Sequence, residues 1–177
     1  MMKSEDKLFF QILEYRDYKG DPMLISHPFE PIYDENSRIL ILGSFPSVRS
    51  RSDGFYYGHP QNRFWKLMAE LYKIEVLRTT EEKKRFLLEN GIALWDVIGS
   101  CEIENSSDSS IRNAVPNPLE RIFEKANIIS VYTNGKTADK LYRQYYQTKS
   151  VCLPSTSPAN AAWTFEKLMG AWEKILS

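Results

Sequence analysis

Two segments of the sequence carry the residue types that could do chemistry. The first covers residues 43–62 and combines Gly, Ser, Pro, Arg, His and Asn with a Phe-Tyr-Tyr run at 55–57. The second covers residues 154–160 and reads Pro-Ser-Thr-Ser-Pro-Ala-Asn. An aromatic ring can stack on a nucleobase, hydroxyl groups can bind phosphate, and side-chain amides can hydrogen-bond a base or a water molecule. The combination favours a site that clamps a base.

Other kinds of site lack their sequence signatures. No Ser/His/Asp arrangement stands in a recognisable context, and neither a phosphate-binding Gly-x-x-x-x-Gly-Lys-Ser/Thr loop nor a Gly-x-Gly-x-x-Gly string occurs. The two cysteines, Cys101 and Cys152, are far apart and show no Cys-x-x-Cys spacing, which argues against zinc and iron–sulfur sites. We therefore expect no metal and no cofactor.

The elements that must position these loops alternate along the chain. Short apolar runs predict strands at 38–42, 92–98, 128–133 and 150–153. Amphipathic spacing and capping residues predict helices at 62–73, 79–90, 118–125, 136–147 and 161–176. Residues 99–115 are polar and Ser-rich and are predicted to form a long loop. The pattern predicts a single α/β domain, a four-stranded and mainly parallel sheet with helices on both faces.

The first loop leaves the carboxyl end of the 38–42 strand, and the second leaves that of the 150–153 strand. In open α/β sheets, ligands bind where such loops converge, so we expect one crevice between the two. Asp96 lies inside an apolar strand, which requires either a structural hydrogen-bond partner or a position near a ligand. The sequence leaves these two alternatives open.

Length and composition are ordinary for a soluble globular protein of one domain. The chain has 177 residues with 23 basic and 23 acidic side chains, whereas a general nucleic-acid coat protein is usually basic. A local basic segment at 49–66 nevertheless carries Arg49, Arg51, Arg63 and Lys66 against Asp53 alone. No apolar run is long enough for a membrane span, and the first residues show no secretory pattern, so we expect a cytoplasmic protein.

The domain is expected to cover residues 31–177. Residues 1–30 are expected to form an extension with a helix at 5–16 and an irregular approach to the first strand. His27 lies in this approach and is interpreted as a loop residue rather than a catalytic one.

Three strings of residues resemble the uracil-DNA glycosylase superfamily. They are Gly-Ser-Phe-Pro-Ser at 43–47, Gly-Phe-Tyr-Tyr-Gly-His-Pro-Gln-Asn-Arg-Phe-Trp at 54–65 and Leu-Pro-Ser-Thr-Ser-Pro-Ala-Asn at 153–160. The resemblance is greatest to the hypoxanthine (deoxyinosine) DNA glycosylase branch, and next to the mismatch-specific uracil glycosylases. It implies a three-layer α/β/α domain that flips a deaminated base out of DNA and hydrolyses its N-glycosidic bond in base excision repair. It also implies a monomer that needs no cofactor.

The resemblance assigns roles to residues of the first loop. Gly43, Ser44 and Phe45 match a motif at the mouth of the base pocket, where many relatives carry an Asp or Asn that this chain lacks. Tyr57 matches an aromatic residue that stacks on the flipped base. Asn62 matches the catalytic residue of the hypoxanthine branch, since an amide can orient water and hydrogen-bond developing charge. Tyr57 can alternatively be a rim or core aromatic, and Asn62 can alternatively cap the helix that follows.

The remaining assignments concern the base edge and the DNA backbone. His59 either stabilises charge on the departing base or holds its loop, and Asp96 matches a position where relatives read the base edge. Expected DNA contacts are Ser47, Arg49, Arg51, Arg63, Ser155, Ser157 and Asn160. Asn160 can alternatively cap the last helix, and the arginines can simply be solvated. Two other functions stay open at this point: excision of uracil or thymine from mismatches with guanine, and a module that binds a lesion or nucleobase without cleavage.

Overall fold

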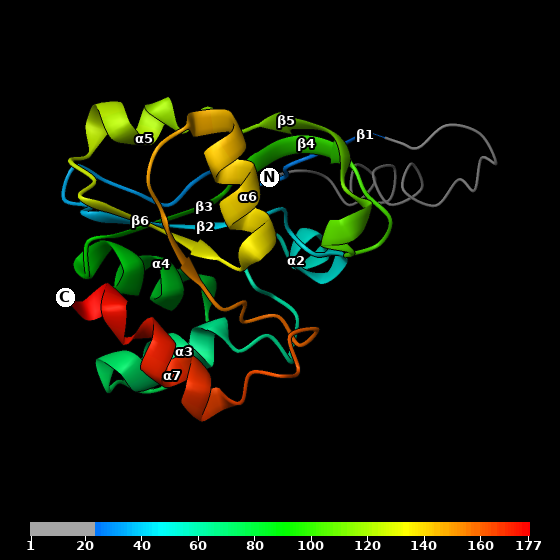
Figure 1. Cartoon of the computed structure of the whole chain (residues 1–177). Coiled ribbons are helices and arrows are strands. Elements are labelled where there is room, and N and C mark those ends of the chain that lie inside the picture. The colour runs from blue at the N-terminus through cyan, green and yellow to red at the C-terminus, as the bar shows by residue number, and fades with distance from the viewer. Residues whose placement is uncertain (1–23) are drawn as a thin grey trace, which may run out of the picture.

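The computed structural model describes residues 24–177 of the chain, and Figure 1 shows how its elements are arranged. The helix predicted at 5–16 lies outside the described residues. A search of the described residues finds no helix long and apolar enough to span a membrane.

A parallel sheet forms the centre of the domain. Its order is β3 (Ile92–Asp96), β2 (Ile39–Gly43), β6 (Ser130–Asn134) and β7 (Val151–Leu153), and each neighbouring pair is parallel. All residues of β2 and β3 are buried, which explains why their sequences are apolar up to Asp96 at the end of β3. The predicted four-stranded parallel sheet is confirmed.

Helices cover both faces of this sheet. Figure 1 shows α5 (Glu120–Lys125) and α6 (Lys136–Tyr146) on one side. On the other side lie α3 (Phe64–Tyr72), α4 (Thr80–Glu89) and α7 (Phe165–Trp172), the last followed by the 3-10 helix η2 (Glu173–Leu176). The sequence starts α4 with a capping box between Thr79 and Glu82. The predicted three-layer α/β/α architecture is confirmed.

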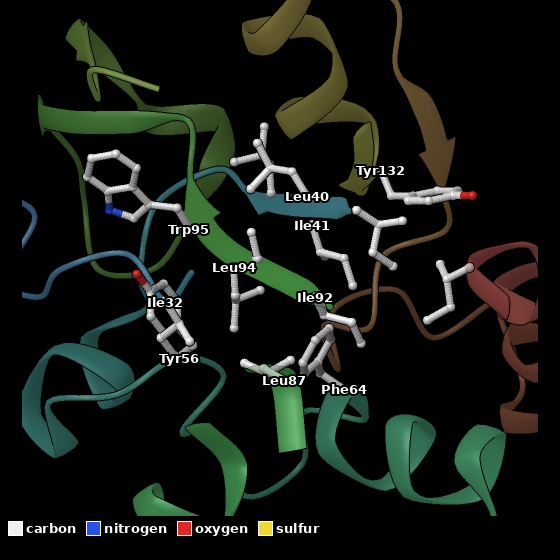
Figure 2. Packing of buried hydrophobic residues seen from close by; sticks show 14 of the residues in the cluster. Ile32, Leu40, Ile41, Tyr56, Phe64, Leu87, Ile92, Leu94, Trp95 and Tyr132 are labelled. Carbon is white, nitrogen blue, oxygen red and sulfur yellow. The ribbon is translucent and has the colours of Figure 1, made fainter. Parts of the chain in front are cut away.

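The core fills both faces of the sheet: α5 and α6 bury Ile122 and Tyr142 on one face, and α3 and α4 pack on the other. Figure 2 shows Leu94 and Ile92 of β3 beside Leu87 of α4 and Phe64 of α3. Phe64 is completely buried and makes an edge contact with Trp172, so α3 and α7 are packed together below the strand ends. This packing fixes the start of α3, where Asn62 and Arg63 stand.

A second sheet replaces the loop predicted at 99–115, and that prediction is wrong. The sheet is antiparallel, in the order β1 (Leu24–Ser26), β4 (Ile98–Glu102) and β5 (Arg112–Pro116), and the 3-10 helix η1 (Asp108–Ser110) lies between β4 and β5. The sequence of β5 is polar because the strand is largely exposed, so it was predicted to be a loop. It pairs with β4 through backbone bonds in an irregular register.

The predicted strand at 92–98 ends at Asp96. The N–H groups of Val97 and Ile98 donate to the carbonyls of Gly43 and Ser44, and the chain then enters β4. The side-chain amide of Asn117 donates to the carbonyls on either side of this turn, those of Asp96 and Ile98, and so satisfies buried acceptors. The turn leaves Asp96 at the end of its strand, directly beside Gly43.

Three other boundaries differ from expectation. The first loop contains the short helix α2 (Val48–Asp53), which Ser47 caps. The last helix begins at Phe165 with Thr164 as its cap, so Asn160 does not cap it. Strand β1 lies within the expected 1–30 extension and pairs with β4, so the folded domain includes residues from Leu24 onward.

Candidate active site

A pocket of about 980 Å³ opens at the carboxyl ends of the parallel strands. Both chemistry-bearing loops contribute to its wall, as expected for a switch point of an α/β sheet. It brings together most of the residues singled out in the sequence: Gly43, Ser44, Phe45, Ser47, Tyr57, His59, Asn62, Asp96, Ser155, Ser157 and Asn160. Arg49, Arg51 and Arg63 are not part of this wall.

Asp96 lines the pocket and is paired behind it with the buried His27. The Nε2 atom of His27 lies 2.8 Å from Oδ2 of Asp96, and the two side chains are only 3% and 5% exposed. The backbone N–H of Phe29 donates to Nδ1 of His27 at 3.4 Å, which leaves Nε2–H to donate to the carboxylate. Asp96 therefore has both features that the sequence left as alternatives: a structural partner and a place in the site.

His27 is a site residue that the sequence interpretation missed. The backbone N–H of His27 donates to the carbonyl of Gly99, and the imidazole ring packs edge-on against Phe29. Its partner is 69 positions away, and no local motif connects the two residues. Only a prediction that β1 pairs with β4 would have brought them together.

Tyr57 has a strained backbone and a buried hydroxyl group. Its φ of 54° lies in the left-handed region, which is costly for a residue with a side chain. The ring stacks on Phe64 with centroids 4.1 Å apart. Burial, and after it the charge of Asp96, raise the pKa of the phenol, so the hydroxyl keeps its proton and can act only as a neutral donor or acceptor.

Gly43 is required where β2 passes this cluster. A Cβ atom at Gly43 would lie 2.2 Å from Oδ1 of Asp96 and 3.2 Å from the hydroxyl oxygen of Tyr57. Both oxygen atoms therefore border the small space above this glycine, and any side chain there would displace the carboxylate.

Asn62 belongs to a hydrogen-bond chain whose polarity is fixed. The N–H of Phe64 donates to Oδ1 of Asn62 at 3.0 Å, and the N–H of Thr156 donates to Oδ1 of Asn134 at 2.9 Å. Because backbone N–H groups only donate, these bonds identify the oxygen of each amide. The Nδ2 atom of Asn134 then donates to Oγ1 of Thr156, which donates to Oδ1 of Asn62. The Asn62 oxygen thus has two donors, and its NH₂ group remains to donate toward a ligand.

Arg63 holds the second loop. Its guanidinium donates to backbone carbonyls of Ser155, Thr156, Ser157, Asn160 and Trp163. The loop is tightened further by the amide of Asn160, which donates to the carbonyl of Ser155. These contacts use the guanidinium inside the protein, so they give Arg63 a structural function that the expectation of phosphate contact did not include.

The remaining expected DNA contacts, Ser47, Arg49 and Arg51, belong to helix α2 or its cap. Arg49 pairs with Asp53 at 2.8 Å on the exposed face, and Arg51 donates to the carbonyl of Pro46 and lies over the ring of Phe45. The Ser47 hydroxyl accepts the N–H of Ser50 as the helix cap. Of this group, Ser47 and Phe45 line the pocket.

His59 and Ser44 have defined partners within the wall. Nδ1 of His59 accepts the backbone N–H of Gln61 at 3.1 Å. This bond lies within the loop and is consistent with the interpretation that His59 holds its loop. The Ser44 hydroxyl donates to Oδ1 of Asp108 at 2.8 Å. Asp108 also lines the pocket, and no sequence motif had marked it as a site residue. Among residues 24–177, no three His, Cys, Asp or Glu side chains are grouped so that they could hold a metal ion.

Comparisons with known proteins identify relatives of this chain. Residues 30–176 match the family model of the uracil DNA glycosylase superfamily. A hypoxanthine DNA glycosylase of Methanosarcina acetivorans is 35% identical over 160 residues, covering 86% of this chain and 98% of that protein. A hypoxanthine DNA glycosylase of Methanosarcina barkeri is 37% identical over 139 residues, covering 75% and 86% of the two chains.

A solved structure shares the fold. It is a solution NMR structure of a Methanosarcina acetivorans protein named as a candidate uracil DNA glycosylase. The TM-score is 0.70 at 30% identity, and the match covers 88% of this chain and 100% of the other. The resemblance noted in the sequence motifs is confirmed, and the chain belongs to the uracil DNA glycosylase superfamily.

Proposed function

We propose that this protein is a monofunctional DNA glycosylase that excises hypoxanthine from DNA by hydrolysis of the N-glycosidic bond. The observation that carries the proposal is the pocket in which the Asn62 amide, the Asp96 carboxylate and the Tyr57 ring meet. The names of the two Methanosarcina relatives support the choice of base. The reaction uses water as the nucleophile, so it needs neither a metal nor a Schiff-base lysine.

Tyr57 is the proposed stacking surface for the extruded base. One face of its ring already packs on Phe64, which holds the ring still. A fixed ring can accept a base on its other face at little entropic cost, and such stacking contributes about 1–3 kcal/mol per base. The left-handed backbone of Tyr57 supports this role, because strain of this kind often occurs at functional sites.

Asp96 is the proposed reader of the base edge. Deamination of adenine converts the N1 acceptor of the base into an N1–H donor. A carboxylate accepts that N–H but repels the lone pair of adenine N1, so it favours the deaminated base. The Nε2–H of His27 holds Oδ2, which leaves Oδ1 for the base. Gly43, Ser44, Phe45 and His59 are proposed to complete the base pocket.

Asn62 is the proposed catalytic residue. Its oxygen is engaged by Phe64 and Thr156, so the side chain acts through its NH₂ group. That group can hold the attacking water by its oxygen or stabilise negative charge that develops on the base. The fixed hydrogen-bond chain means that the amide needs no reorientation during the reaction.

The loops on either side of the pocket are proposed to contact DNA. Ser155 and Ser157 lie on the loop that Arg63 holds, and Ser47, Arg49 and Arg51 belong to helix α2 or its cap. Asn160 is proposed to approach the space that the flipped base vacates. DNA as the substrate supports a cytoplasmic location, and the self-contained pocket supports a monomer.

The test uses duplexes that contain deoxyinosine, deoxyuridine or thymine opposite guanine, followed by alkaline cleavage of abasic sites. Scission of the inosine strand is the expected result. Scission only with uracil or thymine would identify a mismatch-specific enzyme instead. Binding without scission of any strand would identify a lesion-binding module and refute the proposed reaction.

A further inference from the structure

Asp108 occupies a place in the pocket that the proposed mechanism does not use. It starts the 3-10 helix η1, in the segment that connects β4 to β5. Two contacts hold this segment at the pocket: Ser44 donates to the Asp108 carboxylate at 2.8 Å, and the N–H of Val48 donates to Oγ of Ser106 at 2.9 Å. The carboxyl group is therefore tied to the residue that follows β2, although the segment itself is exposed.

The surroundings of this carboxyl group shift its pKa upward from that of an ordinary aspartate. Burial of the carboxyl raises its pKa, and the nearby charge of Asp96 raises it further, whereas the Ser44 hydrogen bond acts in the opposite direction. Two carboxyl groups thus face one pocket in different environments: Asp96 with a histidine donor, and Asp108 with only a serine hydroxyl. Unequal carboxyl pairs of this kind divide acid and base roles in glycosidic chemistry.

A departing purine needs such an acid. Breaking the bond between N9 and the sugar carbon leaves the electron pair on the purine, and a proton on N7 neutralises that charge. The Asn62 amide does not release a proton at neutral pH, and the raised pKa of Tyr57 makes its hydroxyl a poor acid. The carboxyl of Asp108 carries an acidic proton whenever it is in its protonated form.

We propose that Asp108 is the general acid that protonates N7 of the departing purine. The inference rests on the proposed excision of hypoxanthine. The carboxyl O–H passes its proton to N7 as the glycosidic bond breaks, and the bonding electrons stay on the purine. Water then bonds to the sugar carbon and releases one proton to solvent. The Asp108 carboxylate takes up one proton from solvent, which restores its protonated form. The sum is hydrolysis, with neutral hypoxanthine and an abasic sugar as products.

The pH dependence has a defined sign. Only protonated Asp108 is active, so the excision rate should fall as the pH rises through the pKa of this carboxyl. Other titratable groups lie near Asp108 or line the same pocket and bear on the profile: Tyr57, His59, Asp96, Cys101, Lys136, Cys152 and Lys174. A variant at Asp108 is therefore needed to assign the fall in rate at high pH to this carboxyl group.

The experiment compares wild type and Asp108→Asn on deoxyinosine and on 7-deaza-deoxyinosine, which has carbon in place of N7. Asparagine keeps an acceptor for Ser44, so the loop contact can persist. Under single-turnover conditions, Asp108→Asn should lower inosine excision by about 10²-fold or more and should remove the alkaline fall in rate. The 7-deaza substrate should be excised slowly by both proteins at equal rates, because the two changes remove the same proton transfer.

A matched control is Glu104→Gln, a carboxylate in the same segment that does not line the pocket. It should excise inosine at the wild-type rate, and thermal unfolding should show that both variants are folded. Equal inosine excision by wild type and Asp108→Asn would overturn the inference, as would rapid excision of the 7-deaza base by wild type. If wild type excised no inosine at all, the proposed function itself would fail.

Discussion

Replacing His27 by phenylalanine tests the buried His27–Asp96 pair, which orients the carboxylate proposed to bind the edge of the base. Phenylalanine keeps the ring volume and the packing against Phe29, but it removes the Nε2–H that lies 2.8 Å from Asp96. Since the two side chains are 3% and 5% exposed, water cannot readily replace the lost donor. Removing one member of a buried ion or hydrogen-bonded pair costs about 3–5 kcal/mol, and we expect the free energy of unfolding to fall by about that amount.

The control is His27→Gln, whose side-chain amide can present a donor near the position of Nε2. Urea denaturation of wild type and of the two variants measures the free energies of unfolding, and a double variant that combines His27→Phe with Asp96→Asn measures the coupling. We expect glutamine to retain most of the stability and the double change to recover part of the loss. A loss below about 1 kcal/mol for His27→Phe would contradict the reasoning, because it would mean that the pair is effectively solvated.

Three further expectations follow from the contacts of the site. Tyr57→Ala should weaken inosine excision by about 10-fold or more through lost stacking worth about 1–3 kcal/mol, whereas Tyr57→Phe should keep most of the activity; single-turnover rates of the two variants measure this, and equal losses would argue against stacking. Arg63→Lys should loosen the second loop, because one ammonium cannot reach all the carbonyls to which the guanidinium donates. Limited proteolysis should then cut within residues 155–163, and an unchanged cleavage pattern would refute the structural role of Arg63. Burial raises the pKa of the Cys101 thiol to about 11, so below that pH it is largely protonated; alkylation at neutral pH should modify the exposed Cys152 first, and faster labelling of Cys101 would contradict its burial.

The parallel half of the fold could be predicted because its signals are local. Strands β2 and β3 are buried on both faces and so are apolar apart from Asp96 at the end of β3, and a capping box marks the start of α4. The antiparallel sheet has no such signal. Strand β5 is mostly exposed and irregularly paired, so its sequence is as polar as that of a loop.

The candidate site divides in the same way. The residue types of segments 43–62 and 154–160 identified the pocket, since both segments leave strand ends that the parallel topology brings together. The partners of these residues could not be predicted, because each depends on packing between distant segments. His27 reaches Asp96 only through the pairing of β1 with β4, and Asp108 reaches Ser44 only through the fold of the β4–β5 connection.

The orientation of the Asn62 amide is a further property that only the three-dimensional structure provides. An asparagine before a helix is typical of a cap, and Oδ1 does accept the N–H of Phe64. The second bond, from Thr156, comes from a loop 94 positions away. Together they engage the oxygen and leave the amino group for the substrate, so capping and the proposed catalysis use different atoms of one side chain.

The most direct test of the proposed function is the release of free hypoxanthine from a deoxyinosine duplex, measured by chromatography for wild type and Asn62→Ala. We expect wild type to release the free base and leave an abasic strand. The alanine variant should remain folded and bind the duplex, yet release the base at least about 10²-fold more slowly, because it lacks the preorganised amide. Release of hypoxanthine at the wild-type rate by the alanine variant would contradict the central role of Asn62.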